Sequence, residues 1–379
     1  MKLIYCIHSI YNPGGMERVM LNKIRFLHEQ GGYDITIVTT NQQGRPPFYP
    51  IPQGIRLVDL DINYVKVPFK SIARTIGTFL WKRHLHKKRL KSLLMKEKAD
   101  IVLSLYPSES SFIPSIKDGS KKVLELHFNK LFRIQYHRSG IVGLLDKWRT
   151  RQDERIVRRF DKFVVLTHED AGLWGLLPNL AVIPNAVLAK PHDTPVDKMN
   201  RVIAVGRLDY QKGFDRLIDA WALIPEAARE GWTLDIFGQG EWEEMLKERA
   251  VRLGVAGDIT IHKPVSDIDT EYRKSRFIVM TSHFEGFGMV LVEAMVQGIP
   301  AVAFDCPCGP KDIIRDGVNG LLVQEGNTQA LADAMSHLIN NPSFLADLSA
   351  RAPEILDVFS EHAVMAQWEN LFKQLTLQP

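Results

Sequence analysis

The sequence predicts an α/β protein made of two Rossmann-like domains, each with a doubly wound parallel sheet. Short runs of apolar and β-branched residues alternate with longer stretches of helical periodicity, which is the pattern of parallel β-α-β units. The pattern stops once near the middle of the chain and then restarts. At 379 residues, with 45% hydrophobic and 24% charged residues, the chain is also longer than one hydrophobic core usually supports.

In the first domain, an apolar run near the start of the chain is followed by a helical stretch at residues 16–27. Each later run is again short enough for a buried strand. The expected strands lie at residues 3–9, 35–40, 99–106, 122–128 and 162–167.

The second domain repeats this alternation after a linker at residues 182–200, which is rich in Pro, Asn and Asp and lacks sustained periodicity. We therefore predict one domain over residues 1–185 and another over residues 186–359. The expected strands of the second domain lie at residues 202–208, 233–240, 259–264, 277–282, 299–305 and 320–323.

The two halves carry opposite charge. Residues 1–185 contain 30 Lys and Arg against 16 Asp and Glu, a net charge of +14, whereas residues 186–379 contain 18 against 28, a net charge of −10. This asymmetry favours an anionic partner for the first domain, such as a phospholipid surface, a lipid diphosphate or nucleic acid. A solvated basic face without a partner is the alternative.

Cysteine content and hydropathy bear on the compartment. Three cysteines, Cys6, Cys306 and Cys308, are too few and odd in number for a disulfide framework, so we expect a reducing, cytoplasmic environment. The first apolar run is too short for a signal peptide, and no window approaches the roughly 20 apolar residues of a membrane span.

Glycines and cations follow two of the expected strands, where nucleotides bind in parallel sheets. Gly14 and Gly15 open a helix, and their backbone amides could approach an oxyanion without a Cβ in the way. In the second domain, Gly206 and Arg207 follow the apolar residues 202–205 of an expected strand, and Lys212 precedes a helix that is expected to begin near residue 214. Arg207 and Lys212 could converge on one diphosphate and offset the charge of a leaving nucleoside diphosphate without a divalent ion.

A second loop combines glycines with two carboxylates. Glu285 precedes the helix that follows residues 277–282, and Glu293 lies two turns inside that helix. Carboxylates that face one crevice can hold two sets of hydroxyls, one on a sugar and one on ribose. The amides at Phe287, Gly288 and Met289 would address phosphate, and Gly286 helps to shape the loop.

These segments resemble the family 4 glycosyltransferases, a group of retaining enzymes with the GT-B architecture whose hallmark is two glutamates separated by seven residues. Glu285 and Glu293 have that spacing, and the likeness extends from the Gly14-Gly15 loop to a final helix that contains Trp368. The resemblance implies two Rossmann-like domains facing a central cleft, with a C-terminal helix, residues 360–379, that crosses back to the first domain.

The resemblance also implies roles for individual residues. Arg207 and Lys212 would bind the donor diphosphate, Glu293 the ribose hydroxyls, and Glu285 the donor sugar near its anomeric carbon. His127, at the end of the run 122–128, matches the active-site histidine of the family; from the residues alone, a hydrogen-bonded core histidine is the alternative.

The implied function is transfer of a hexose or N-acetylhexosamine from a nucleotide diphosphate sugar to a glycan or lipid-linked acceptor in polysaccharide or lipopolysaccharide synthesis. A loop at residues 305–310 resembles members that use UDP-linked donors. We expect no cofactor. The alternatives are a sugar-nucleotide 2-epimerase with the same architecture and a catalytically silent sugar-nucleotide-binding subunit.

We expect no metal site, although two Asp-x-Asp spacings would suit a metal-dependent transferase. Asp59 and Asp61 alternate with apolar residues on a half-buried strand, which places both on its solvent face. Asp267 and Asp269 precede a helix and are explained by capping.

The segment from Lys70 to Lys98 predicts a basic amphipathic helix. Together with the +14 charge of its domain, it favours peripheral attachment to anionic lipid at the inner face of the cytoplasmic membrane. Nucleic acid is the weaker alternative because no binding module or interleaved aromatic platform is present.

Overall fold

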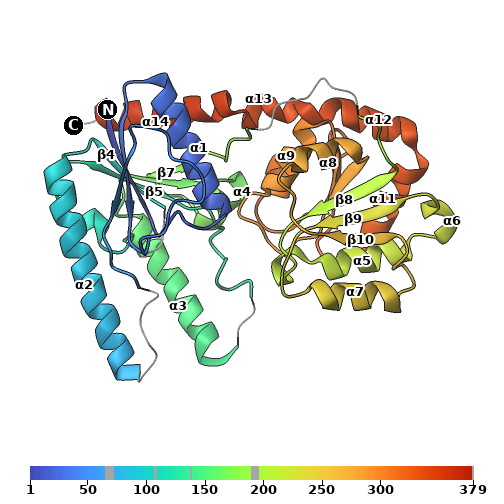
Figure 1. Cartoon of the computed structure of the whole chain (residues 1–379), viewed down its shortest axis with the longest axis horizontal. Helices are drawn as coiled ribbons and strands as arrows, with labels where there is room; N and C mark the ends of the chain where they lie inside the picture. Colours follow the sequence, from blue (N-terminus) through green and yellow to red (C-terminus); the bar gives the residue numbers. More distant parts are fainter. Residues whose placement is uncertain (65–71, 106–108, 137–138, 189–195, 378–379) are drawn as a thin grey trace.

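The computed structural model describes residues 1–64, 72–105, 109–136, 139–188 and 196–377. Lys70, Tyr106 and residues 189–195 of the predicted linker lie outside the described residues. Two α/β domains lie side by side, each with a central sheet and helices on both faces (Figure 1). The predicted division into two Rossmann-like domains with parallel sheets is confirmed. None of the described helices is long and apolar enough to cross a bilayer.

The first sheet has seven parallel strands in the order β3-β2-β1-β4-β5-β6-β7. Its central strands are buried on both faces, as parallel strands between helical layers must be, and Leu3, Ile4 and Tyr5 are wholly inaccessible. Its elements are β1 (Lys2–Ile7), α1 (Gly15–Gln30), β2 (Asp34–Thr39), β3 (Arg56–Asp59), α2 (Ile72–Glu97), β4 (Ile101–Ser104), η1 (Ile113–Ser115), β5 (Lys121–Glu125), α3 (Gly140–Val157), β6 (Lys162–Val165), α4 (His168–Trp174) and β7 (Leu180–Val182).

The second sheet has six parallel strands in the order β10-β9-β8-β11-β12-β13. Two apolar clusters cover its two faces, one including α5 and α11 and the other α9. Its elements are β8 (Arg201–Val205), η2 (Tyr210–Lys212), α5 (Phe214–Leu223), α6 (Glu226–Arg229), β9 (Thr233–Phe237), α7 (Glu243–Arg252), β10 (Ile259–His262), α8 (Ile268–Lys274), β11 (Phe277–Met280), α9 (Met289–Val296), β12 (Ala301–Phe304), α10 (Pro310–Ile313), β13 (Gly320–Val323), α11 (Thr328–Asn340) and α12 (Pro342–Arg351).

The chain crosses between the domains twice. After η3 (Ala352–Ile355) and α13 (Leu356–Phe359), which pack on the second domain, α14 (Glu361–Leu377) returns to the first (Figure 1). Trp368 and its neighbours on α14 are buried in the core of the first sheet together with Leu3 and Tyr5. The outgoing and returning segments are hydrogen bonded, since the Val187 amide donates to the Phe359 carbonyl at 2.8 Å. The sheets fall on either side of Asn185, and the boundary at that residue stays a prediction.

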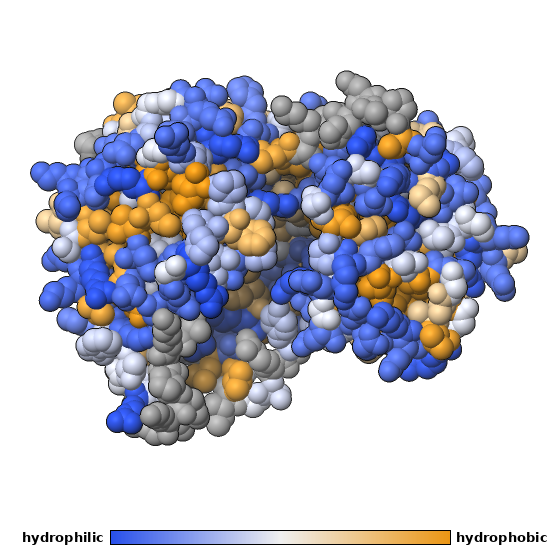
Figure 2. Space-filling view, in the orientation of Figure 1, coloured by the Kyte–Doolittle hydropathy of each residue, from blue (hydrophilic) through white to orange (hydrophobic). Residues whose placement is uncertain are grey.

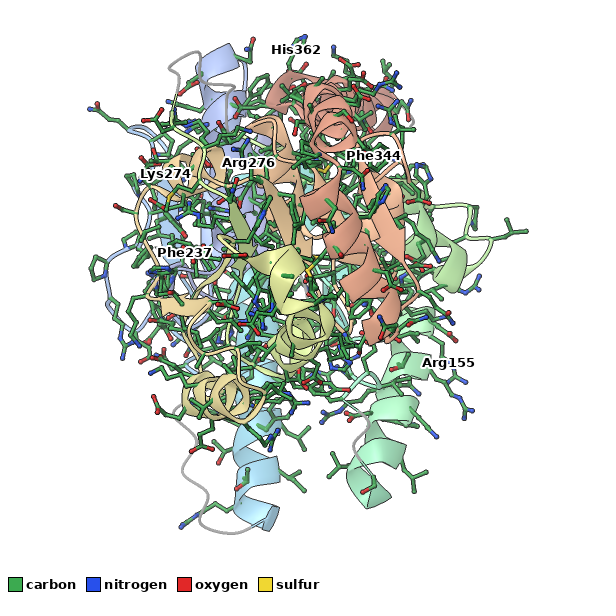
Figure 3. The ribbon with its side chains drawn as sticks, turned by 90° about the vertical axis from the view of Figure 1, so that its right-hand side faces the viewer. Arg155, Phe237, Lys274, Arg276, Phe344 and His362 are labelled. Atoms are coloured by element: carbon green, nitrogen blue, oxygen red, sulfur yellow. The ribbon has the colours of Figure 1, made fainter. Side chains whose placement is uncertain are left out.

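Helices α2 and α3 extend beyond the first sheet with their amino-terminal ends outermost; Figure 3 shows them from the side of the second domain, with Arg155 labelled on α3. Leu90 and Leu94 of α2 pack into the core, as an amphipathic helix requires. Lys82 differs from the solvated cation that the sequence suggests, because its side chain is buried and its ammonium donates to the Asn63 carbonyl.

Candidate functional site

The loops that follow strands of the two sheets meet between the domains, where the surface is hollowed (Figure 2). Gly14 caps α1 after β1, and His127 follows β5 by two residues. Gly206 follows β8, and Lys212 ends η2 just before α5, which begins at Phe214 as expected. The loop from β11 to α9 carries the first of the two glutamates.

Glu285 and Lys212 form one cluster at the carboxyl edge of the second sheet. The Lys212 ammonium lies 2.7 Å from Oε1 of Glu285, and the Ser282 hydroxyl donates to the same oxygen at 2.6 Å. The two loops are also joined through their backbones, since the His283 amide donates to the Gln211 carbonyl at 2.8 Å. Glu285 is therefore fixed by a cation and a hydroxyl before any ligand is bound.

Arg207 is placed differently from Lys212. Its side chain is 66% exposed, and its guanidinium donates to Oε1 of Gln211 at 2.8 Å and lies 3.3 Å from Asp209. The aliphatic part of Lys212, in contrast, covers Gly206, where a Cβ would lie 3.0 Å from it. The two cations thus have separate partners in this structure, and the proposed convergence on a diphosphate requires Arg207 to turn towards the ligand.

The second domain touches the first at Gly286. A Cβ on Gly286 would lie 2.4 Å from the carbonyl oxygen of His127, so only glycine allows this approach of two backbones. Beside it, the Asn129 side-chain amide donates to the Glu285 carbonyl at 2.8 Å. The loop that carries Glu285 is therefore held directly against the segment that carries His127.

Glu293 lies in the second turn of α9, one turn nearer the helix start than expected, because the helix begins only at Met289. The Arg18 guanidinium of α1 donates to its carboxylate across the domain boundary. Burial raises the pKa of Glu293, and Arg18 opposes that rise. Both residues line a cavity of about 320 Å³ with Asn22 and Asp267. Arg18 has no motif signal of its own; only the fold brings it to Glu293.

A side chain of the protein itself, Glu17, occupies the Gly14-Gly15 loop. The Glu17 carboxylate folds back over the start of α1, so that a Cβ on Gly14 would lie 1.9 Å from Oε2. A carboxylate is favoured there by the unpaired amides and the helix dipole. Burial raises the pKa of Glu17. An anionic ligand that used these amides would have to displace Glu17.

The loop at Phe287, Gly288 and Met289 forms the start of α9. Gly288 caps the helix with a φ of 95°, in the region that favours glycine. Phe287 is buried, and its ring packs against Phe359 at a centroid distance of 5.4 Å. The amides at this helix start lie next to Glu285 in sequence, and their contact with phosphate stays a prediction.

His127 lies beside a buried ion pair that the sequence did not reveal. Its Nε2 is 3.2 Å from Oε1 of Glu125, and both oxygens of Glu125 accept from the Lys23 ammonium, at 2.6 and 2.7 Å. Burial alone would raise the pKa of Glu125, but Lys23 and His127 outweigh it and hold that pKa at about 2. Burial lowers the pKa of Lys23.

The Asp-x-Asp pairs have structural partners. Asp59 ends β3 and accepts from the Thr39 hydroxyl, whereas Asp61 lies beyond the strand with a φ of 48°, so the prediction that both share one strand face was wrong. Asp267 caps α8 by accepting from the Thr270 amide. Within the described ranges, no group of three potential metal-ligating side chains was found.

Sequence comparisons cover almost the whole chain. The family description "Glycosyltransferase Family 4" matches residues 13–188, and "Glycosyl transferases group 1" matches residues 189–355. The chain is 26% identical to an "Uncharacterized glycosyltransferase" of Haemophilus influenzae over 98% of this chain and 99% of that one. It is 28% identical to the amylovoran biosynthesis glycosyltransferase AmsD of Erwinia amylovora, again over 98% and 99%.

The fold is similar to that of solved glycosyltransferases. HepE of Anabaena, solved in complex with UDP and glucose, superimposes with a TM-score of 0.74 at 18% identity and covers 99% of this chain and 100% of that one. At this identity the likeness concerns the fold.

Proposed function

The chain belongs to the group 1 glycosyltransferases of glycosyltransferase family 4, and on that premise we propose that it is a retaining, metal-independent hexosyltransferase that uses a UDP-linked sugar. The transferred group would be a hexose or N-acetylhexosamine. The acceptor would be a glycan or lipid-linked glycan in cell-surface polysaccharide or lipopolysaccharide synthesis, since the relatives include the amylovoran enzyme AmsD and the Rhizobium meliloti lipopolysaccharide core enzyme LpsE.

The observation that carries this proposal is the contact between two parts of the site. The loop that carries Glu285, which is paired with Lys212, packs against the segment that carries His127. The donor would lie on the second domain, with its diphosphate at Lys212 and Arg207 and its sugar between Glu285 and His127. The bond between the anomeric carbon and the diphosphate oxygen breaks as the acceptor oxygen bonds to that carbon from the same face, and the leaving phosphate takes the acceptor proton. The protein contributes orientation and electrostatic stabilisation of the leaving group.

Glu293 and Arg18 fit the nucleoside end of this donor. The ribose hydroxyls would replace the Arg18 guanidinium as donors to Glu293, or share the carboxylate with it. The cavity of about 320 Å³ beside them is lined by both domains, so a bound nucleoside would bridge α1 and α9. The solved structures of HepE with UDP and of the pneumococcal O-GlcNAc transferase GtfA with UDP and GlcNAc support a uridine nucleotide.

Donor identity is tested by thermal shift. We expect UDP and one UDP-sugar to raise the melting temperature of the protein, because they bind only the folded state. At a ligand concentration of 100 times Kd, this binding adds about 2.7 kcal/mol to the free energy of unfolding. GDP and ADP at equal concentration serve as controls. A larger shift with GDP than with UDP would contradict the uridine assignment.

The type of activity is tested separately. Transfer of the sugar to an acceptor would identify a transferase, and a change at C2 of the sugar would identify an epimerase. No turnover at all would indicate a silent subunit.

Metal independence is tested with a chelator. We expect excess EDTA to leave the initial rate of transfer almost unchanged, because Lys212 and Arg207 supply the positive charge that a divalent ion would otherwise provide. Rates are compared with and without EDTA, and then with added Mg²⁺ or Mn²⁺. Loss of transfer on chelation and its recovery with either metal would show that the proposed leaving-group stabilisation is wrong.

Peripheral membrane contact is proposed for the projecting ends of α2 and α3. Phe79, Leu80 and Trp81 of α2 are exposed, and Leu144 and Trp148 of α3 are exposed as well. Cations surround the first group, since α2 contains eight Lys and Arg and one acidic residue, Glu97. Exposed aromatic and leucine side chains with neighbouring cations are typical of contact with an anionic bilayer.

We expect the protein to sediment with vesicles that contain anionic lipid, to bind neutral vesicles weakly and to be released towards about 0.5 M salt, where screening is short-ranged. Changing Lys87, Lys88 and Lys91 together to Gln should abolish binding and spare transfer to a soluble acceptor. Lys82 and Arg89 are left intact, because they donate to the backbone carbonyls of Asn63 and Leu60. The matched control changes Lys247, Lys263 and Lys274 on the second domain. No binding by the unchanged protein at low salt would remove the membrane from the proposal.

A further inference from the structure

We propose that Glu125 is the positioning residue of His127, with the buried Lys23 as its counter-ion. The inference rests on the proposed function, in which His127 meets the donor sugar. Glu125 would accept a hydrogen bond from the protonated Nε2 of His127, which fixes the ring orientation and leaves Nδ1 as the nitrogen that can meet a ligand. None of the sequence motifs includes Glu125 or Lys23, and neither has another role in the site.

The first support is the isolation of the histidine nitrogen. Nε2 of His127 is inaccessible to solvent and makes no well-aligned hydrogen bond among the described residues. The Glu125 oxygen at 3.2 Å is therefore the group placed to orient it. A buried polar atom without a partner costs free energy, so a protonated Nε2 directed at this carboxylate is the favoured tautomer.

The second support is the setting of the carboxylate. Glu125 points to the face of the first sheet that α1 and α14 cover. There α1 supplies Lys23 and α14 supplies Trp368. The Lys23 ammonium lies 3.5 Å from the centre of the Trp368 ring, so the indole also faces the cation that Glu125 binds. A buried ion pair adds little net stability compared with apolar residues of similar volume, which suggests that this one serves another purpose.

The other charged groups near His127 fit this arrangement. Glu17 of α1 interacts electrostatically with the ring from the Gly14-Gly15 loop. On the loop that packs against the His127 carbonyl, Glu285 is already neutralised by Lys212. Glu125 is thus the acid in contact with Nε2, while Glu17 is the anion that a bound donor would displace. Lys23 limits how strongly Glu125 can hold a proton on the ring.

Histidine ¹⁵N NMR tests the proposal without relying on activity. In the unchanged protein, the neutral His127 ring should carry its proton on Nε2, with the signal assigned by its loss in His127→Gln. Glu125→Gln should release the proton from Nε2, so that both neutral tautomers are seen, because the anion that holds it there is lost and Lys23 remains. Lys23→Met should keep the proton on Nε2, because Glu125 is still present.

The matched control is Lys122→Met, which breaks the buried pair of Lys122 with Asp118 at the other end of β5. It should lower the melting temperature and leave the His127 tautomer unchanged. If Glu125→Gln folds poorly, the double variant with Lys23→Met removes both charges and should still lose the fixed tautomer.

An unchanged tautomer in Glu125→Gln or in the double variant would overturn the proposal. A purely structural role would move the melting temperature alone. Wild-type transfer by His127→Gln would instead overturn the role of His127 in the proposed function, and the NMR result would distinguish the two failures.

Discussion

Replacing Lys212 by Ala is expected to lower the rate of sugar transfer by at least about a hundredfold, the scale seen when one charge contact to a transition state is lost. The same reduction is expected for Arg207→Ala. The fold should survive the first change, because the Ser282 hydroxyl still donates to Glu285 after the ammonium is gone. Initial rates at saturating donor, together with melting temperatures, measure the effect.

A matched control for these variants is Lys263→Ala, since that lysine is 71% exposed and pairs with Glu243 on the surface. It should transfer sugar at the normal rate. Rates within a few-fold of the unchanged protein for both Lys212→Ala and Arg207→Ala, at unchanged melting temperature, would remove the two cations from the mechanism.

Gly286→Ala should reduce transfer by a similar or larger factor, for a steric reason. The new methyl group would lie 2.4 Å from the His127 carbonyl oxygen, so the loop that carries Glu285 must move away from the first domain. A displacement of about 1 Å at reacting groups can cost about a hundredfold in rate. Both domains should remain folded, because the clash is between them.

The comparison for this variant is Gly257→Ala, whose added Cβ would meet no atom within 4 Å. Its rate should match that of the unchanged protein. A Gly286→Ala enzyme with normal kcat and KM would show that the observed approach of the two backbones is not needed for transfer.

Local patterns sufficed for most strands of the parallel sheets and for the loops that carry Lys212 and Glu285, because strand periodicity and glycine placement are properties of short segments. They missed β7, which has only three residues. They could not reveal Arg18 opposite Glu293, or Lys23 opposite Glu125. These partners are 275 and 102 residues apart in the chain, and the packing of α1 on the first sheet, with its first turn facing the second domain, brings them together. A single buried lysine in an amphipathic helix looks, in sequence, like any other cation.

The same limit explains the errors on exposed-looking residues. Lys82 lies in a run of cations, a pattern typical of a solvated helix face, yet its ammonium donates to the Asn63 carbonyl and its side chain is buried. Asp61 follows an alternating pattern but lies past the end of β3, where a positive φ reverses the chain. Alternation alone cannot indicate where a short edge strand ends.

The return of α14 to the first domain also has a consequence for protein synthesis. The core around β1 includes six side chains between Val364 and Leu375, so it lacks part of its apolar contacts while the ribosome is still making the second domain. Domains usually fold in order as they emerge, at about 5–20 residues per second. The sheet of the second domain contains none of these late residues. The second domain can therefore complete its folding before the first domain does. The amino-terminal domain is then exposed, incomplete, for the roughly ten to forty seconds needed to translate residues 186–375 at that speed.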